Sequence, residues 1–180
     1  YVKFRNVATG LYIDGMGYTN NGADVAQWSS SNDNNQQWTI ETIGSFVMIK
    51  NRTTGLYIDG MGRTSNGANA SQWSSSSDNN QQWTMETSGS YVRFKNRTTG
   101  LYLDGMGRTS NGSILSQWSD SSSNNQQWEP CGQEVQIRRW LHNLRQMIQH
   151  GRRDWSLHTL LEICMERKAR FLRCLKSMMC

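Results

Sequence analysis

The sequence is poor in two residue types that shape many small folds. It has one proline and four cysteines in 180 residues, and no cysteine precedes position 131. Disulfide bonds therefore cannot stabilise the first 130 residues, whose stability must come from packing. No run of 18 apolar residues occurs, which excludes a membrane-spanning helix. No basic segment followed by an apolar one opens the chain, so no signal peptide is predicted.

The sequence also lacks the usual signatures of catalysis. It has no Ser/His/Asp set and no glycine-rich phosphate loop, and neither CxxC nor HxxxH spacing occurs. We therefore predict no catalytic residues, no metal site and no cofactor. A nucleic acid or a membrane is not an expected partner either, because the positive charge is modest and spread out.

The charge and the cysteines divide the chain into two parts. Residues 1–128 hold nine Lys/Arg and nine Asp/Glu, whereas residues 129–180 hold ten and five, together with all four cysteines and all three histidines. The one proline, Pro130, lies at this change. We predict two domains, residues 1–129 and a basic segment 130–180.

The first part is a threefold repeat. Residues 11–38 return as 56–83 and as 101–128, each time 45 residues later, and residues 46–83 match 91–128 at 29 of 38 positions. A period of this size decides the fold before any single residue does. The predicted repeats are 1–45, 46–90 and 91–129.

Each repeat has the pattern of four short strands. In the first repeat the strands are predicted at 1–5, 11–14, 25–28 and 37–40, with a tight turn at Asn21-Gly22. Twelve such strands in a closed threefold arrangement would leave no exposed sheet edge. The prediction is an all-β fold with pseudo-threefold symmetry.

Three QxW motifs occur at equal spacing, and each follows an L-Y-[IL]-D-G segment and a Q-W-S segment. The motifs are Gln36-Gln37-Trp38, Gln81-Gln82-Trp83 and Gln126-Gln127-Trp128. In these motifs residues 1–128 resemble the ricin-type β-trefoil lectins. The near-identity of the copies also resembles symmetric β-trefoils made by design from this family. The resemblance implies a β-trefoil fold, binding of galactose-type glycans and a secreted protein.

A site for a galactose-like sugar needs an aromatic plate for its C–H face, a carboxylate for two adjacent hydroxyls, and amides that both donate and accept. Each repeat offers one Asp, one Trp, one Asn and one Gln of this kind, and the matching positions in the ricin-type lectins bind sugar. The three predicted sets are Asp14, Trp28, Asn35 and Gln36; Asp59, Trp73, Asn80 and Gln81; and Asp104, Trp118, Asn125 and Gln126.

Structural roles compete with this interpretation. The tryptophans of the QxW motifs, Trp38, Trp83 and Trp128, are predicted in the core rather than in a site. Trp28 and its copies suit packing as well as sugar stacking, and an Asp after a strand often caps a turn. Ala26, Ser71 and Ser116 occupy the position of a Gln that some family members use as an extra sugar contact, which leaves the sugar preference open.

The last segment changes to helical spacing. Apolar residues recur at intervals of three and four, which predicts two helices at about 133–149 and 154–178, arranged as a hairpin. So small a unit usually needs disulfides or a partner. We predict protein binding or self-association through Trp140, Leu144, Leu157, Leu160 and Leu161, the last three within an LxxLL motif. In the alternative to a lectin function, the trefoil is a scaffold or fusion carrier for this segment.

Overall fold

The structure is a computed structural model that describes residues 1–132. The predicted helical hairpin and its partner-binding candidates lie outside the described residues. The described part is all-β apart from three single-turn 3-10 helices: η1 (Asn34–Gln36), η2 (Asn79–Gln81) and η3 (Asn124–Gln126). None of the helices within residues 1–132 has the length and apolar character needed to cross a membrane.

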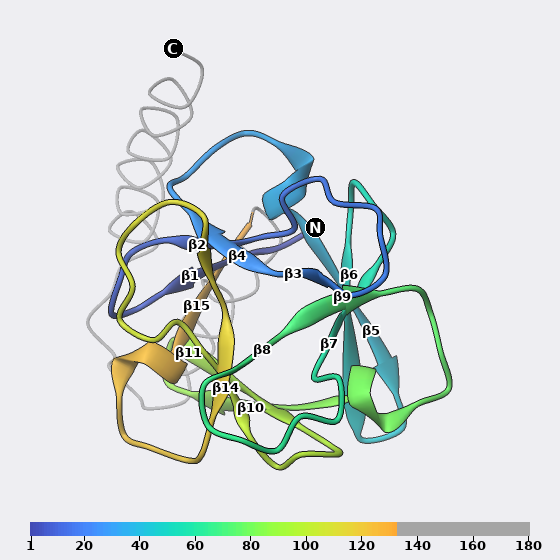
Figure 1. Ribbon diagram of the computed structural model, residues 1–180. Coiled ribbons are helices and arrows are strands. Elements are labelled where there is room, and N and C mark those ends of the chain that lie inside the picture. Colours follow the sequence, from blue (N-terminus) through green and yellow to red (C-terminus); the bar gives the residue numbers. More distant parts are fainter. Residues whose placement is uncertain (133–180) are drawn as a thin grey trace, which may run out of the picture. The chain divides into compact units, whose positions relative to one another are not determined.

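Fifteen strands take the place of the twelve predicted, because the third strand of every repeat is interrupted once (Figure 1). The first repeat holds β1 (Lys3–Asn6), β2 (Tyr12–Asp14), β3 (Ala23–Asp24), β4 (Ala26–Trp28) and β5 (Trp38–Ile43). The second holds β6 (Phe46–Asn51), β7 (Tyr57–Asp59), β8 (Ala68–Asn69), β9 (Ser71–Trp73) and β10 (Trp83–Ser88). The third holds β11 (Tyr91–Asn96), β12 (Tyr102–Asp104), β13 (Ser113–Ile114), β14 (Ser116–Trp118) and β15 (Trp128–Cys131).

The three interrupting residues are Val25, Ala70 and Leu115, and all are fully buried. Their backbones form a closed ring. Val25 N donates to Ala70 O (3.2 Å), Ala70 N to Leu115 O (3.0 Å) and Leu115 N to Val25 O (2.8 Å). Each residue leaves its own hairpin to bond the equivalent residue of another repeat. The break therefore follows from the threefold arrangement.

The six long strands close into a barrel. β5 pairs with β6 and β10 with β11, as hairpins between successive repeats, and β15 pairs with β1, which joins the third repeat to the first. Three further pairings connect the hairpins, each between a valine and the tryptophan of a QxW motif: Val2 with Trp38, Val47 with Trp83, and Val92 with Trp128. No barrel edge remains open, as the pattern predicted.

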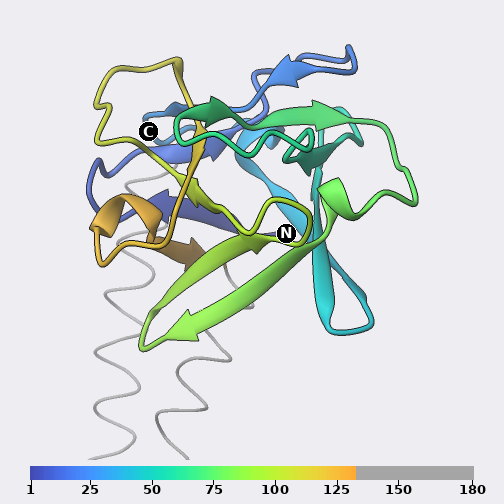
Figure 2. The same cartoon turned by 60° about the horizontal axis from the view of Figure 1, so that its bottom comes forward.

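The short strands form a second ring over one end of the barrel, and Figure 2 shows them on the side opposite the long hairpins. β3 pairs with β9, β8 with β14, and β13 with β4, so each repeat is joined to the next. Within a repeat, β2 pairs with β4, β7 with β9 and β12 with β14. These pairs carry the predicted site residues.

The core confirms the structural role of the QxW tryptophans. Trp38, Trp83 and Trp128 are fully buried. The indole Nε1 of each donates to a backbone carbonyl 25 residues earlier, at 3.1, 3.0 and 3.2 Å respectively. A buried indole N–H needs such a partner, and the large ring supplies most of the apolar contact. Each repeat thus ties its last strand to its second.

Buried amides lock the repeats together, a feature that the sequence analysis missed. Asn6, Asn51 and Asn96 donate from Nδ2 to a carbonyl of another repeat, at 2.7, 2.8 and 2.7 Å. Their Oδ1 atoms accept two backbone N–H groups of the following turn. A second set donates from Nε2 to glycine carbonyls of another repeat: Gln27 to Gly105, Gln72 to Gly15 and Gln117 to Gly60.

The sheet runs beyond the predicted domain boundary at residue 129. Strand β15 continues through Pro130 to Cys131, where Cys131 pairs with Lys3 of β1. The closing strand of the barrel therefore includes the first two residues that the sequence analysis assigned to the basic segment.

Candidate functional site

Three candidate sites lie at corresponding positions, where β2, β7 and β12 end, and we number them by repeat. Their carboxylates, Asp14, Asp59 and Asp104, are the last residues of these strands and are 4–5% exposed. In each, Oδ1 accepts the backbone N–H of the methionine two residues later, at 2.7, 2.6 and 2.6 Å. This contact is the turn-capping role that the sequence left open for them.

The turn that this bond closes has an unusual backbone. Met16, Met61 and Met106 have φ of 58°, 56° and 58°, in the left-handed region that residues with a side chain seldom adopt. Such a conformation persists only where neighbouring contacts hold it. Here the hydrogen bond from the methionine N–H to the carboxylate is such a contact. The same bond fixes the position of the carboxylate.

The three glutamines bond the loops beside the carboxylates, and Gln36 also bonds a carboxylate itself. Gln36 is fully buried, and its Nε2 donates to Asp14 Oδ2 (3.1 Å) and to Ser29 O (2.8 Å). Its Oε1 accepts Ser31 N at 3.0 Å. The equivalent Gln81 and Gln126 are also fully buried and bond the same loop. With no exposed surface, the three glutamines bond the protein itself in this structure, and their predicted contact with a sugar stays a prediction.

The asparagines lie beside the carboxylate loop. Gly15 N donates to Asn35 O at 3.0 Å, and the same pairing joins Gly60 to Asn80 and Gly105 to Asn125. A Cβ placed on Gly17 would lie 3.6 Å from both polar atoms of the Asn35 side chain. Within residues 1–132, no side-chain amide of the three asparagines takes part in a hydrogen bond. Each amide can therefore still donate and accept.

The tryptophans complete the set from the neighbouring strand. Asp14 pairs with Ala26 and Tyr12 with Trp28 across β2 and β4, which places Asp14, Ala26 and Trp28 on one face of the hairpin. Trp28 is 36% exposed and Trp118 37%, and Trp73 is partly buried. The same register holds in the other two repeats.

The far edge of each indole contacts a different repeat. A Cβ on Gly22, Gly67 or Gly112 would lie 3.6 Å from the six-membered ring of Trp73, Trp118 or Trp28, in that order. The predicted Asn21-Gly22 turn is present, with Gly22 at φ 88°. Asn21 then exchanges hydrogen bonds with Ser74, the residue after Trp73, at 3.0 and 2.8 Å. The packing role of these tryptophans is therefore present, and their predicted stacking on a sugar stays a prediction.

Burial changes the acidity of one carboxylate. The pKa of Asp59 is raised above its ordinary value because burial disfavours the charged form. The Met61 N–H, the Gln81 amide and the positive charge of Arg63 oppose this effect without cancelling it. Within the described residues, no group of three His, Cys, Asp or Glu side chains could hold a metal ion.

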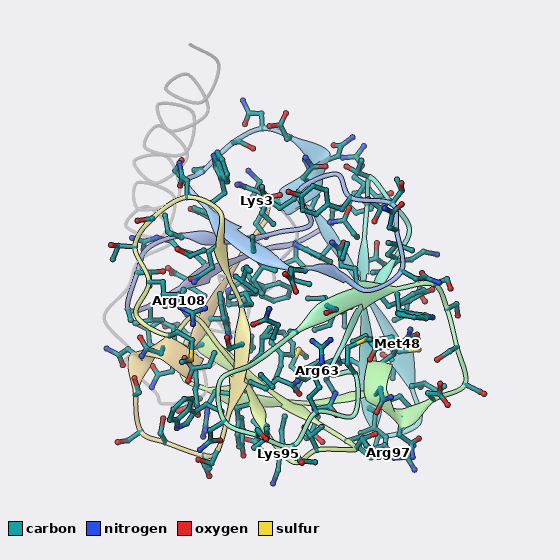
Figure 3. The ribbon with its side chains drawn as sticks, viewed as in Figure 1. Lys3, Met48, Arg63, Lys95, Arg97 and Arg108 are labelled. Atoms are coloured by element: carbon teal, nitrogen blue, oxygen red, sulfur yellow. The ribbon has the colours of Figure 1, made fainter. Side chains whose placement is uncertain are left out.

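The surroundings of the sites differ in ways that the sequence analysis did not single out. The residue after each Gly-Met-Gly segment is Tyr18, Arg63 or Arg108. Corresponding positions on β1, β6 and β11 carry Lys3, Met48 and Arg93, and Figure 3 labels the first two of them. A comparison of the three repeats at those positions would have found both sets, since their residue type changes within an otherwise uniform sequence.

With this geometry, comparison with known families gives a clear result. The family described as ricin-type beta-trefoil lectin domain-like matches residues 1–73 and 79–145. The chain belongs to this family. Comparison with curated protein sequences gives no match.

Comparison with solved structures also finds proteins with a similar fold. The chain is similar to ThreeFoil, a designed threefold-symmetric protein, with a TM-score of 0.69 and 32% identity over 73% of this chain and 98% of that one. It is similar to a ricin B-like lectin from Macrolepiota procera in complex with lactose, with a TM-score of 0.63 and 21% identity over 72% and 94%. It also resembles 29% of an exo-beta-1,3-galactanase from Clostridium thermocellum, at 28% identity over 72% of this chain and a TM-score of 0.68.

Proposed function

We propose that the chain is a non-catalytic, multivalent lectin that binds galactose-type glycans through three sites, one in each repeat. The observation that carries this proposal is that the same three groups occur together in every repeat. Every repeat holds a carboxylate fixed by its neighbours, an asparagine amide without a hydrogen-bond partner among residues 1–132, and a partly exposed indole on the same hairpin. Packing alone gives no reason for an unengaged amide to recur in all three repeats.

The chemistry of these groups fits a sugar. A carboxylate oxygen accepts more than one hydrogen bond, so the Asp14 side chain can take two adjacent hydroxyls while it keeps its bonds to Met16 and Gln36. The Asn35 amide donates to one hydroxyl and accepts from another. The face of Trp28 packs against the C–H side of the ring. In this proposal Gln36 and its copies act through the carboxylate.

The choice of sugar rests on the relatives. The Macrolepiota procera lectin shares the fold and was solved with lactose, and another neighbour is a Polyporus squamosus lectin bound to a sialylated galactose epitope. A galactoside is therefore the first ligand to test. A monosaccharide buries little area, so each site is expected to be weak, and three sites on one body raise the affinity for a sugar-dense surface by about 10² to 10⁴.

The test is a calorimetric titration of the full chain with lactose, read for stoichiometry as well as affinity. Three sites per chain are expected. The triple variant Asp14→Asn, Asp59→Asn, Asp104→Asn should abolish the heat, because each amide donates a hydrogen bond where the carboxylate accepted one. Circular dichroism would show that the variant stays folded.

A matched control is Asp33→Asn. Asp33 is an exposed residue that precedes η1 and makes no side-chain bond to the helix end, so this variant removes the same charge beside site 1 without touching the site. It should bind lactose like the parent. If neither lactose nor a wider panel of glycans binds the parent chain, the lectin proposal is wrong. The trefoil is then a scaffold, and the function lies in residues 130–180.

A further inference from the structure

The three sites are not chemically equivalent. Sites 2 and 3 carry Arg63 and Arg108 in the loop after the carboxylate, whereas site 1 carries Tyr18, which is 51% exposed. Figure 3 shows the two arginines on corresponding loops of their repeats. The rest of each loop differs only at Asn20, where the other repeats have Ser65 and Ser110, so the position of Tyr18 alone changes the charge of the loop.

The two arginines are tethered in the same way. Arg63 Nη1 donates to Asn69 O at 3.0 Å and to Ser71 Oγ at 3.4 Å. Arg108 Nη1 donates to Ile114 O at 2.8 Å and to Ser116 Oγ at 3.5 Å. The repeated pair of contacts holds each guanidinium in a defined place by one nitrogen.

That place is the sugar site. Ser71 lies opposite Asp59 in the pairing of β7 with β9, and Ser116 lies opposite Asp104 in the pairing of β12 with β14. The tether therefore brings each guanidinium to the residue facing the site carboxylate. The charge of Arg63 is close enough to Asp59 to lower the pKa of that carboxyl, against the larger effect of burial.

Neither arginine forms an ion pair within residues 1–132, and both are exposed. Their Nη2 and Nε donors thus have no acidic partner in this part of the chain. A guanidinium offers five donors in a fixed plane, which suits a carboxylate or a sulfate better than a neutral hydroxyl. Sites 2 and 3 each have one tethered guanidinium group without an ion pair among residues 1–132. Such a group can bind the negative charge of an anionic glycan.

Site 1 differs in every one of these features. Tyr18 brings no charge, and Ala26 lacks the hydroxyl that Ser71 and Ser116 provide for the tether. Asp24 stands where the other repeats have Asn69 and Ile114, and its carboxylate accepts the Asn69 amide at 3.2 Å. Site 1 therefore presents an aromatic ring and a negative charge, which disfavour an anionic ligand.

We propose that Arg63 and Arg108 give sites 2 and 3 a preference for glycans with an anionic group, a sulfate or a carboxylate, on the bound sugar or the one linked to it, and that site 1 lacks this preference. This inference rests on the proposed lectin function. It turns a lectin with three equal sites into one with two anion-preferring sites and one neutral site.

The experiment titrates the full chain with lactose, with lactose 3′-sulfate and with 3′-sialyllactose at low ionic strength. Lactose should bind all three sites alike. At least one of the anionic sugars should bind two sites about tenfold more tightly than lactose, because a hydrogen bond to a charged group is worth about 1.5 kcal/mol or more. The advantage should shrink as salt is added. The sugar that shows it identifies the anion as sulfate or carboxylate.

The double variant Arg63→Tyr, Arg108→Tyr copies the rim of site 1 into the other two sites. It should lose the tighter binding and keep the affinity for lactose. Arg97→Tyr is the matched control, since it removes the same charge from a guanidinium that packs over the Phe46 ring and bonds Gln82. This control should retain the preference.

The outcomes separate the two proposals. If lactose binds but neither anionic sugar binds more tightly, the inference is wrong and the lectin function stands. If the preference survives in the double variant, the arginines do not carry it, and the inference is again wrong. If no sugar binds at all, the lectin proposal itself fails.

Discussion

The three repeats keep the same hydrogen-bonding residues in the interior of this trefoil, whereas they differ in the residues at the rim of the candidate sites. Inside, the equivalent positions that carry side-chain hydrogen bonds between elements hold the same residues, as in Asn6, Asn51 and Asn96 or in the three QxW tryptophans, whereas purely apolar positions such as Val25, Ala70 and Leu115 vary in size. At the rim, the same comparison gives Tyr18, Arg63 and Arg108. Identity in the interior and variation at the rim occur within 20 residues of each other in every repeat.

Physical constraint explains the contrast. Each interior amide bonds a carbonyl of another repeat, so a substitution in one repeat leaves unpaired groups in two. A rim side chain faces water on one side and changes only its own site. The fold therefore fixes the shared scaffold and leaves each site free to acquire its own ligand. Four predictions test this division, from the largest effect to the smallest.

Gly60→Ala should be the most damaging, because Gly60 lies against the interior amides. A Cβ there would lie 2.7 Å from Asn96 Nδ2 and 2.8 Å from Gln117 Oε1. Both side chains must move and lose hydrogen bonds between repeats. We expect the free energy of unfolding in urea to fall by about 3 kcal/mol.

The control is Gly89→Ala, at the tip of the hairpin between β10 and β11. A Cβ on Gly89 meets no atom within 4 Å, although its φ of 57° favours glycine. This variant should lose only about 1 kcal/mol, the cost of the left-handed backbone. Equal losses in the two variants would show that the interior contacts do not set the stability.

Gln36→Ala should affect the scaffold and one site together. It removes the donor to Asp14 and both bonds to the loop after Trp28, which are buried. We expect the free energy of unfolding to fall by about 2 kcal/mol and lactose binding to be lost at site 1 alone. Urea unfolding and calorimetric stoichiometry measure the two effects.

Gln37→Ala is the matched control, since Gln37 contacts the exposed Arg52 guanidinium and should change neither quantity by much. A Gln36 variant that loses sugar affinity while keeping its full stability would point to direct sugar contact, as the sequence analysis predicted.

Much of the fold could be predicted from the sequence because it depends on spacing. The 45-residue period, the QxW motifs and the Asn21-Gly22 turn define repeats, core and hairpins without reference to distant residues. The interruption at Val25 could not be predicted, because its cause is a backbone bond to Ala70 in another repeat. The same limit hid the locking amides, since a polar residue on a strand gives no sign of a buried partner.

The sequence predicts the residue types of the candidate site but not the orientation of their side chains. Trp28 is partly exposed, whereas Asp14 and Gln36 are buried and Gln36 bonds the carboxylate of Asp14. Its amide suits a sugar hydroxyl and a carboxylate equally well, so its chemistry alone could not distinguish the two roles. The differences at Arg63 and Arg108 were visible in the sequence but gained meaning only from their tethers beside the carboxylates.

The third prediction concerns pH at site 2. Sugar hydroxyls donate to the charged Asp59 carboxylate, so binding is present above its pKa and is lost as the pH falls through it. Because burial raises this pKa, the loss should begin at a higher pH than for an ordinary Asp, whose pKa is about 3.9. The affinity should fall about tenfold for each pH unit below the pKa.

This prediction needs a chain with one active site. The variant Asp14→Asn, Asp104→Asn leaves site 2 alone, and lactose titrations across the acid range then report only on Asp59. The free energy of unfolding, measured at each pH, shows that the chain is folded throughout. An affinity that stays constant down to pH values below 3.9 would contradict the raised pKa.

The fourth prediction concerns the positions between interior and rim that hold Lys3, Met48 and Arg93. A substitution there should have the smallest effect on the free energy of unfolding. Arg93 pairs with Glu86 at 3.8 Å and with Asp120, whose side chain is 67% exposed, and its Nη2 donates to Gln126 at 2.9 Å. Exposed ion pairs contribute little, and the buried Arg93 Nε has no partner among the described residues. Arg93→Met, which copies repeat 2, should change the free energy of unfolding by less than about 1 kcal/mol.

The reverse variant, Met48→Arg, sharpens the comparison. Met48 is only 8% exposed, and its cross-strand neighbour is Glu41, but Ser75 stands where repeat 3 has Asp120. The new charge would be buried with fewer partners, so this variant should lose more stability than Arg93→Met does. If Arg93→Met instead costs more than about 2 kcal/mol, the ion pairs of Arg93 belong with the interior locks, and the boundary between fixed scaffold and free rim lies further out than we place it.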